Sequence, residues 1–178
     1  ADAASQGSVL FARWLRAMVG GAEAPFATPY RPSAPRTTPD GLADPEAAVQ
    51  TLAEAAQTVE DRHDSLDVPW GAVHRLVGPE GSYPASGGDG LFGLFRVLRF
   101  DEMEGGRRRA TFGDSYVALT EFTEEGPRAK AVLPYGNASQ PGSPHRGDQL
   151  QLYAEKKMRP VWHSRDSVRA HLERRVTF

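Results

Sequence analysis

Two apolar stretches joined by a short polar connection constrain the fold of this chain more than any other feature. Residues 113–122 carry apolar side chains on both alternating sets, and residues 128–134 do so with smaller side chains. A strand that is covered on both faces has this pattern. Residues 123–127 contain Gly and Pro, as hairpin loops do. We therefore predict a β-hairpin over residues 113–134 that forms the centre of the core.

A further strand is predicted just before this hairpin. Residues 94–100 are rich in Leu, Phe and Val, and the polar residues 102–109 form a turn back into 110–122. The three strands would make an antiparallel meander. The fold class is then α+β, with antiparallel strands over about 94–134 and helices at both ends.

The first predicted helix covers residues 3–19. Its apolar side chains cover much of the circumference, so we expect it to be buried on more than one side. Ser5 is the expected N-cap, and two glycines stop the helix. The apolar stripe at four-residue spacing is Leu10, Trp14 and Met18, widened by Phe11, Leu15 and Val19.

A second helix is predicted over residues 44–61. Asp44 is the expected N-cap and Pro45 the first helical residue, an order that helix N-termini favour. Its narrow apolar stripe comprises Val49, Leu52, Ala56 and Val59. The remaining side chains predict one solvated face.

Two helices are predicted after the hairpin. Asp148 is the expected N-cap of a helix to about Met158, with Gln151 in a capping-box position. Pro160 ends that helix, and Ser164 caps a final one on which Val168, Leu172 and Val176 align.

Five prolines in residues 23–41 exclude a helix and disfavour sheet pairing. One interpretation is an extended linker. We favour a segment laid over a surface and held by Phe26 and Tyr30, because flexible linkers are poor in aromatic residues. The chain is thus divided into a helical segment with a Pro-rich connection, 1–62, and a sheet-forming segment with C-terminal helices, 63–178, both parts of one larger enzyme domain.

Composition gives no reason to expect nucleic acid or a membrane as a partner. The 178 residues carry 21 basic and 23 acidic side chains, a net charge of −2. No apolar run reaches the roughly 20 residues that span a bilayer, and no signal peptide is visible. Cysteine is absent, which excludes disulfides and thiolate metal sites. The basic run 107–109 is interpreted as a solvated hairpin tip.

Three groups of residues are candidates for a catalytic or ligand-binding site within this chain. Ser143, His145 and Asp148 have the types of a hydrolytic triad, but six residues of sequence do not place a base between a nucleophile and an acid. We expect local turn bonds from Ser143 and a helix cap from Asp148. The glycines of 87–90 precede a strand rather than a helix, so a turn is predicted there instead of a phosphate loop.

A metal site is the third possibility. The candidate ligands lack the spacing of known sites, and we interpret them as solvated or packed side chains. They are His63, Asp64, Asp67 and His74, and near the C-terminus His171 and Glu173. No catalytic, cofactor-binding or metal-binding residue is predicted in the chain.

Four short motifs give the chain a resemblance to a known family. The loop 136–145, GNASQPGSPH, is followed by Asp148-Gln149 and resembles the signature near the C-terminus of the penicillin acylase family. Similar pieces occur in that family's order at 38–42, 66–71 and 113–116. The branch it resembles acts on aculeacin A and acyl-homoserine lactones.

This resemblance implies part of an αββα sandwich and an N-terminal-nucleophile mechanism. In that mechanism the α-amino group of a terminal Ser activates its own hydroxyl. This chain begins with Ala1, which has no nucleophilic atom. The resemblance therefore implies the C-terminal part of the large (β) subunit, a structural segment that is inactive alone.

The resemblance also implies the partners and setting of the segment. These are the remainder of the large subunit, a small (α) subunit, and a substrate that is an acylated amide such as a penicillin, an acyl-homoserine lactone or a lipopeptide. The enzyme would be a heterodimer processed from a precursor, without a cofactor, in the periplasm or outside the cell. The competing hypothesis is a self-sufficient, non-catalytic binding module that uses glycine-rich loops. A segment of a larger sheet should expose apolar surface that such a module covers.

Overall fold

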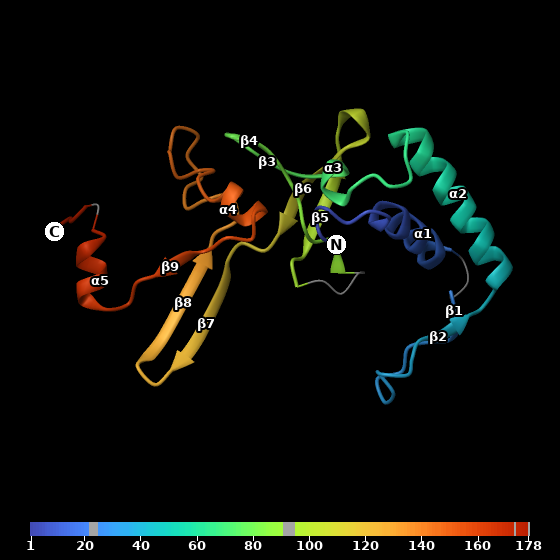
Figure 1. Ribbon diagram of the computed structural model, residues 1–178, viewed down its shortest axis with the longest axis horizontal. Helices are drawn as coiled ribbons and strands as arrows, with labels where there is room; N and C mark the ends of the chain where they lie inside the picture. The colour runs from blue at the N-terminus through green and yellow to red at the C-terminus, as the bar shows by residue number, and fades with distance from the viewer. Residues whose placement is uncertain (22–24, 91–94, 173, 178) are drawn as a thin grey trace.

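The computed structural model describes residues 1–21, 25–90, 95–172 and 174–177. The molecule is elongated, with two helices at one end, a four-stranded sheet in the middle and a protruding hairpin toward the other end (Figure 1). Helices and sheets occupy different stretches of the chain, which confirms the α+β class. No helix in these described ranges has the length and apolarity needed to cross a lipid bilayer.

Helix α1, Ser8–Gly20, begins later than predicted. Residues before it form a turn in which the Ala4 amide donates to Asp2 Oδ1, and the Ala3 amide donates to Ser86 Oγ at 3.0 Å. These bonds hold the N-terminal residues against the central loop, so Ser5 is not the cap. The predicted burial on several sides is wrong, because Phe11 is 49% exposed.

Helix α2, Pro45–His63, confirms the predicted start. The Asp44 carboxylate accepts from the Ala47 amide at 2.9 Å. The predicted stripe is confirmed at Val59, which is buried, but it is wrong at Val49, which is 68% exposed, and Ala48 and Ala55 are buried instead. Small residues let α1 approach closely enough for Trp14 Nε1 to donate to the Ala48 carbonyl oxygen at 3.0 Å.

The proline-rich stretch forms a two-stranded ribbon. Strands β1, Phe26–Thr28, and β2, Asp40–Leu42, pair antiparallel, although the prolines were predicted to disfavour sheet pairing. The prolines after Pro25 lie in the connection between the strands and therefore remove no ladder bond. Tyr30 is 59% exposed and does not anchor this segment.

The central sheet has the strand order β4-β3-β6-β5. Its outer pairs are antiparallel, and β3 runs parallel to β6. The short helix α3, Trp70–Val73, leads directly into β3. The strands are β3 His74–Gly78, β4 Gly81–Pro84, β5 Leu98–Glu102 and β6 Arg108–Gly113, with the 3-10 turn η2 Glu104–Gly106 between the last two.

A second sheet contains the hairpin, in the order β7-β8-β9. Its strands are β7 Val117–Thr123, β8 Gly126–Val132 and β9 Arg159–Val161. The predicted single strand over 110–122 is broken after Gly113, so the meander is wrong and its strands belong to two sheets. A side chain at Gly113 would lie 2.5 Å from the Val97 carbonyl oxygen, which shows how closely the two chains pack there.

The core lies against the central sheet rather than around the hairpin. Leu119 is 66% exposed and Phe122 is 87% exposed, so the prediction that this hairpin centres the core is wrong. The buried cluster joins α1, α2 and α3 to the sheet and to Leu150 and Tyr153 of helix α4, Leu150–Ala154.

The C-terminal helices are shorter than predicted. Helix α4 begins after Gln149 without a side-chain cap, so the predicted Asp148 cap is wrong, and it ends well before Pro160. Helix α5, Arg165–Ala170, confirms the predicted cap, because Ser164 Oγ accepts from the Ser167 amide at 3.1 Å.

Candidate functional site

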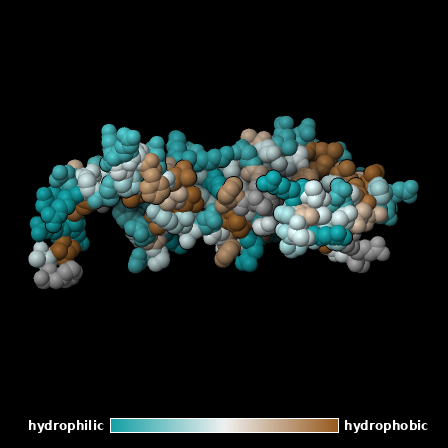
Figure 2. Space-filling model, turned by 90° about the horizontal axis from the view of Figure 1, so that it is seen from below, coloured by the Kyte–Doolittle hydropathy of each residue, from teal (hydrophilic) through white to brown (hydrophobic). Residues whose placement is uncertain are grey.

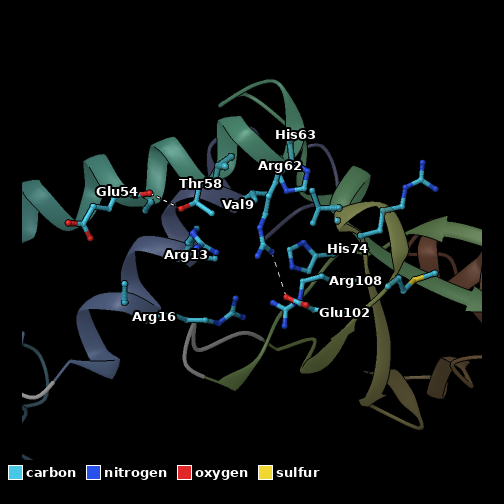
Figure 3. A pocket seen from close by; sticks show the side chains of 18 of the residues that line it. Val9, Arg13, Arg16, Glu54, Thr58, Arg62, His63, His74, Glu102 and Arg108 are labelled. Carbon is cyan, nitrogen blue, oxygen red and sulfur yellow. Dashed lines mark hydrogen bonds and ion pairs between the residues drawn. The ribbon is translucent and has the colours of Figure 1, made fainter.

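A hollow lies between the helical end and the central sheet. It has a volume of about 840 Å³ and is bounded by α1, α2, β3 and the β5–β6 hairpin (Figure 3). Basic side chains dominate its polar lining, against the net charge of −2 on the whole chain. The charged lining residues are Arg13, Arg16, Arg62, Arg107 and Arg108, with Glu54 and Glu102.

His74 lies at the wall of this pocket and is 2% exposed. Its ring stacks on Trp70 with centroids 3.6 Å apart and meets the edge of Phe100 at 4.7 Å. Burial between these rings lowers the pKa of His74 to about 3, so the imidazole is neutral at neutral pH.

One tautomer of this neutral ring is favoured. His74 Nδ1 is 3.2 Å from the Trp70 carbonyl oxygen, which can only accept, so Nδ1 carries the proton and donates. Nε2 then presents a lone pair. It is buried and has no hydrogen-bond partner among the residues that the structure describes. From the sequence alone, His74 is only a weak candidate for a metal ligand.

Arg108 stands beside His74 because the two residues are partners in the parallel β3–β6 register. Its Nη2 donates to the Phe100 carbonyl oxygen at 2.9 Å, and its buried Nε has no partner in the described part of the chain. Burial lowers the pKa of the Arg108 guanidinium. The prediction of a solvated tip is therefore wrong for Arg108, since η2 forms the tip and Arg108 lies in β6.

The other arginines approach from the two helices (Figure 3). Arg16 of α1 is paired with Asp89 at 2.6 Å. Arg62 of α2 is 3.7 Å from Glu102, and both side chains are more than half exposed, so this pair is weak. Arg62 can therefore exchange Glu102 for another anion at little cost.

The loop that connects β8 to α4 is closed on itself. The amides of Asn137 and Ala138 both donate to the His145 carbonyl oxygen, at 2.8 and 3.2 Å. The two ends of the loop are held together by Gln149, whose Oε1 accepts a hydrogen bond from the Leu133 amide at 3.1 Å. A side chain at Gly136 would lie 2.2 Å from the His145 carbonyl oxygen, so this position requires glycine.

The structure brings together two of the three triad candidates in this loop. His145 Nδ1 is 3.0 Å from Asp148 Oδ2. Ser143 Oγ accepts from the backbone amide of His145 at 3.2 Å, the local turn bond that the sequence predicts. No contact between the Ser143 hydroxyl and the His145 ring occurs among the described hydrogen bonds, so a base and an acid are paired without a nucleophile.

The predicted metal candidates are dispersed. His63 ends α2, Asp64 follows it in the left-handed conformation with φ 57, and the Asp67 amide donates to Ser65 Oγ. His171 stacks on Trp162 at 3.9 Å, and Glu173 lies outside the described residues. Across the ranges that the structure describes, no group of three or more His, Cys, Asp or Glu could hold a metal ion.

The glycine-rich stretch at 87–90 contains a β-bridge, and Gly87 has a left-handed φ of 111. Gly88 forms a bridge with Val97, and its amide donates to the Arg96 carbonyl oxygen at 3.1 Å. The Gly87 amide donates to the Ala1 carbonyl oxygen at 2.8 Å. The loop thus joins the N-terminal residues to β5.

The penicillin amidase family model matches residues 1–170 of this chain. The chain belongs to the penicillin amidase family. Among its relatives is the acyl-homoserine lactone acylase PvdQ of Pseudomonas putida, 28% identical over 82% of the chain and 19% of the relative. The PvdQ of Pseudomonas savastanoi pv. phaseolicola is 27% identical over 92% and 22%. The aculeacin-A acylase of Actinoplanes utahensis is 30% identical over 88% and 19%.

This penicillin amidase family chain spans about a fifth of the length of these relatives. The sequence identifies the 135–149 loop as a candidate site. It does not predict the hollow lined by Arg13, Arg16, Arg62, Arg107 and Arg108, here called the arginine pocket, because these residues come from elements far apart in the chain. One local signal was present. Arg13 and Arg16 are three residues apart on α1 and therefore lie on one face of a helix whose other face is apolar.

Proposed function

We propose that residues 1–178 are the C-terminal segment of the large subunit of an amide-hydrolysing acylase. The proposal rests on the family and on two relatives whose names give an acyl-homoserine lactone and aculeacin A as substrates. The acyl group is transferred to an N-terminal Ser on polypeptide outside this segment, and water then releases it. The substrate class is an acylated amide, such as a penicillin, an acyl-homoserine lactone or a lipopeptide.

The observation that carries the structural role is the uncovered β7–β8 hairpin. Phe122, on one face, is 87% exposed, and Leu119, on the other, is 66% exposed. Figure 2 views the molecule from the side toward which the hairpin points, and hydrophobic side chains lie open among hydrophilic ones. Exposed apolar strands of this kind mark a missing partner. The remainder of the large subunit and the small subunit are the partners that we propose.

The same observation argues against a self-sufficient binding module, which would cover its own hairpin. The hydrogen bonds of the 135–149 loop support the proposal that this segment has no nucleophile of its own, because Ser143 Oγ accepts from the backbone amide of His145 and is not bonded to the His145 ring. We further propose that residues 1–62 and 63–178 are two parts of one larger enzyme domain. A two-subunit enzyme in the periplasm or outside the cell is the setting proposed from the family.

The test compares amide hydrolysis by the complete polypeptide and by residues 1–178 alone. An acyl-homoserine lactone and a penicillin are the substrates, and the released amine is measured. We expect hydrolysis by the complete polypeptide, less than about 1% of that rate from residues 1–178, and an acyl-enzyme whose mass maps to an N-terminal Ser. In the complete polypeptide, Ser143→Ala should keep its activity within about twofold.

Two results would contradict this proposal. Hydrolysis by residues 1–178 at a rate comparable with the complete polypeptide would place a nucleophile in this segment. Loss of hydrolysis in Ser143→Ala, with unfolding temperature unchanged, would assign that role to Ser143. Asn137→Ala, in the same loop, is the control for general damage to the loop.

A further inference from the structure

The arginine pocket combines positive charge with a buried hydrogen-bond acceptor. Arg62 and Arg108 reach it from α2 and β6, and His74 Nε2 lies at its wall with a lone pair that no described residue satisfies. A buried acceptor without a donor is disfavoured by an amount comparable to a lost hydrogen bond. A ligand that satisfies the pocket therefore needs both an anionic group and a donor of its own.

Simple anions divide into two kinds by this requirement. A carboxylate or a sulfate has only acceptor atoms at neutral pH, so it can pair with the arginines but leaves His74 Nε2 unsatisfied. Hydrogen phosphate keeps an O–H at neutral pH and can pair with arginine and donate at the same time. The fixed tautomer of His74 thus selects between anions of the same shape and charge.

We propose that this pocket binds a hydrogen-phosphate group, with its oxygens on Arg62 and Arg108 and its P–O–H donated to His74 Nε2. The cavity of about 840 Å³ is large enough to admit a phosphate ion. The ligand class is inorganic phosphate, because a phosphate monoester is mostly a dianion at pH 7 and has no P–O–H to donate. This inference does not rest on the acylase proposal, because ligand binding and hydrolysis are measured separately.

The test is calorimetric titration of the complete polypeptide in a buffer free of phosphate and sulfate. Inorganic phosphate and sulfate are titrated separately at pH 7 and equal ionic strength. We expect phosphate to bind at least about tenfold more tightly than sulfate, the ratio that one buried hydrogen bond supplies. Glycerol 3-phosphate is titrated in parallel, and because its phosphate group is mostly a dianion without a P–O–H at pH 7, it should bind no more tightly than sulfate.

Three variants separate the contributions. His74→Phe keeps an aromatic ring against Trp70 but removes Nε2, so phosphate affinity should fall about tenfold to that of sulfate. Arg62→Gln, more than half exposed, should weaken phosphate and sulfate alike by about threefold to tenfold. Arg99→Gln makes the same charge change outside the pocket and should leave both affinities unchanged.

The proposal is overturned by any of three results. The complete polypeptide could bind no phosphate, which would mean that another part of it fills the pocket. It could bind phosphate and sulfate equally, which would remove the role of His74. Arg99→Gln could weaken binding as much as Arg62→Gln, which would reduce the effect to overall charge. If His74→Phe fails to fold, the proposal is decided by the preference of the wild type for phosphate over sulfate and by the comparison of Arg62→Gln with Arg99→Gln.

Discussion

At the scale of single residues, the environment of His74 disfavours a charged imidazole. The ring lies between Trp70 and Phe100, and the nearest charged groups at the pocket are arginines rather than carboxylates. Burial disfavours an added proton on the ring, and the charges of Arg108, Arg16 and His63 disfavour it further. The neutral form is therefore built into the packing and does not depend on a bound ligand.

We predict a pH dependence from this residue. Its folded pKa of about 3 is below the ordinary 6.5, so between these values the unfolded state binds a proton that the folded state does not. Stability from His74 is complete above pH 6.5 and is lost as the pH falls toward 3. Lowering the pH from 7 to 5 should cost about 2 kcal/mol from this group.

Ring NMR signals of labelled histidine in the complete polypeptide test this directly. One signal should stay at its neutral position down to about pH 4, and it should be the signal that His74→Phe removes. His74→Phe should also unfold with less pH sensitivity between pH 7 and 5. Titration of every histidine signal above pH 5.5 would contradict the prediction.

At the scale of elements, the β7–β8 hairpin presents two unlike faces. Ala118 and Phe122 share one face with Pro127 and Ala129 of β8, and all are uncharged. Leu119 is on the other face, between the charged side chains of Glu121 and Lys130. The uncharged face is therefore the better surface for packing against the remainder of the enzyme.

A pair of variants tests this surface. Phe122→Ser in the complete polypeptide should reduce stability by about 1.5–3 kcal/mol, the value of burying a large apolar side chain. Glu121→Ser, its neighbour on the charged face, should change stability by less than about 0.5 kcal/mol. The measurement is chemical unfolding of both variants beside the wild type. Equal effects would mean that the Phe122 face is not covered.

Local signals predicted some elements well and long-range pairing poorly. The caps at Asp44 and Ser164 are short-range hydrogen bonds and were predicted correctly. The break after Gly113 was missed, because it is set by the close packing of that residue on Val97 rather than by its own sequence. The stripe of α2 was wrong at Val49, because close approach to α1 favours alanine. Of the candidate site, the sequence predicted the Ser143 bond but not the pocket.

At the scale of the whole molecule, packing is uneven along the length. α1, α3 and α4 contribute to one core with the central sheet, whereas the hairpin extends beyond it (Figure 1). A free-standing domain normally covers its apolar strands. The uneven packing supports the proposal that the chain is a segment of a larger enzyme.

Residues 1–178 alone should therefore self-associate. We expect light scattering after size exclusion to show species larger than the 19.4 kDa monomer, and thermal unfolding to lack a single cooperative transition. Phe122→Ser should reduce this association and so improve the behaviour of residues 1–178, whereas in the complete polypeptide the same change should reduce stability. A monomer with clean two-state unfolding would instead favour the binding module.

The parallel pairing of β3 with β6 has a kinetic consequence. His74 and Arg108 face each other only across this pair, while β4 and β5 lie between the two strands in the chain. The hairpins on either side close short loops, but joining β3 to β6 closes a long one and bears a larger entropic penalty. We therefore expect the arginine pocket to assemble late in folding, after the two local hairpins have formed.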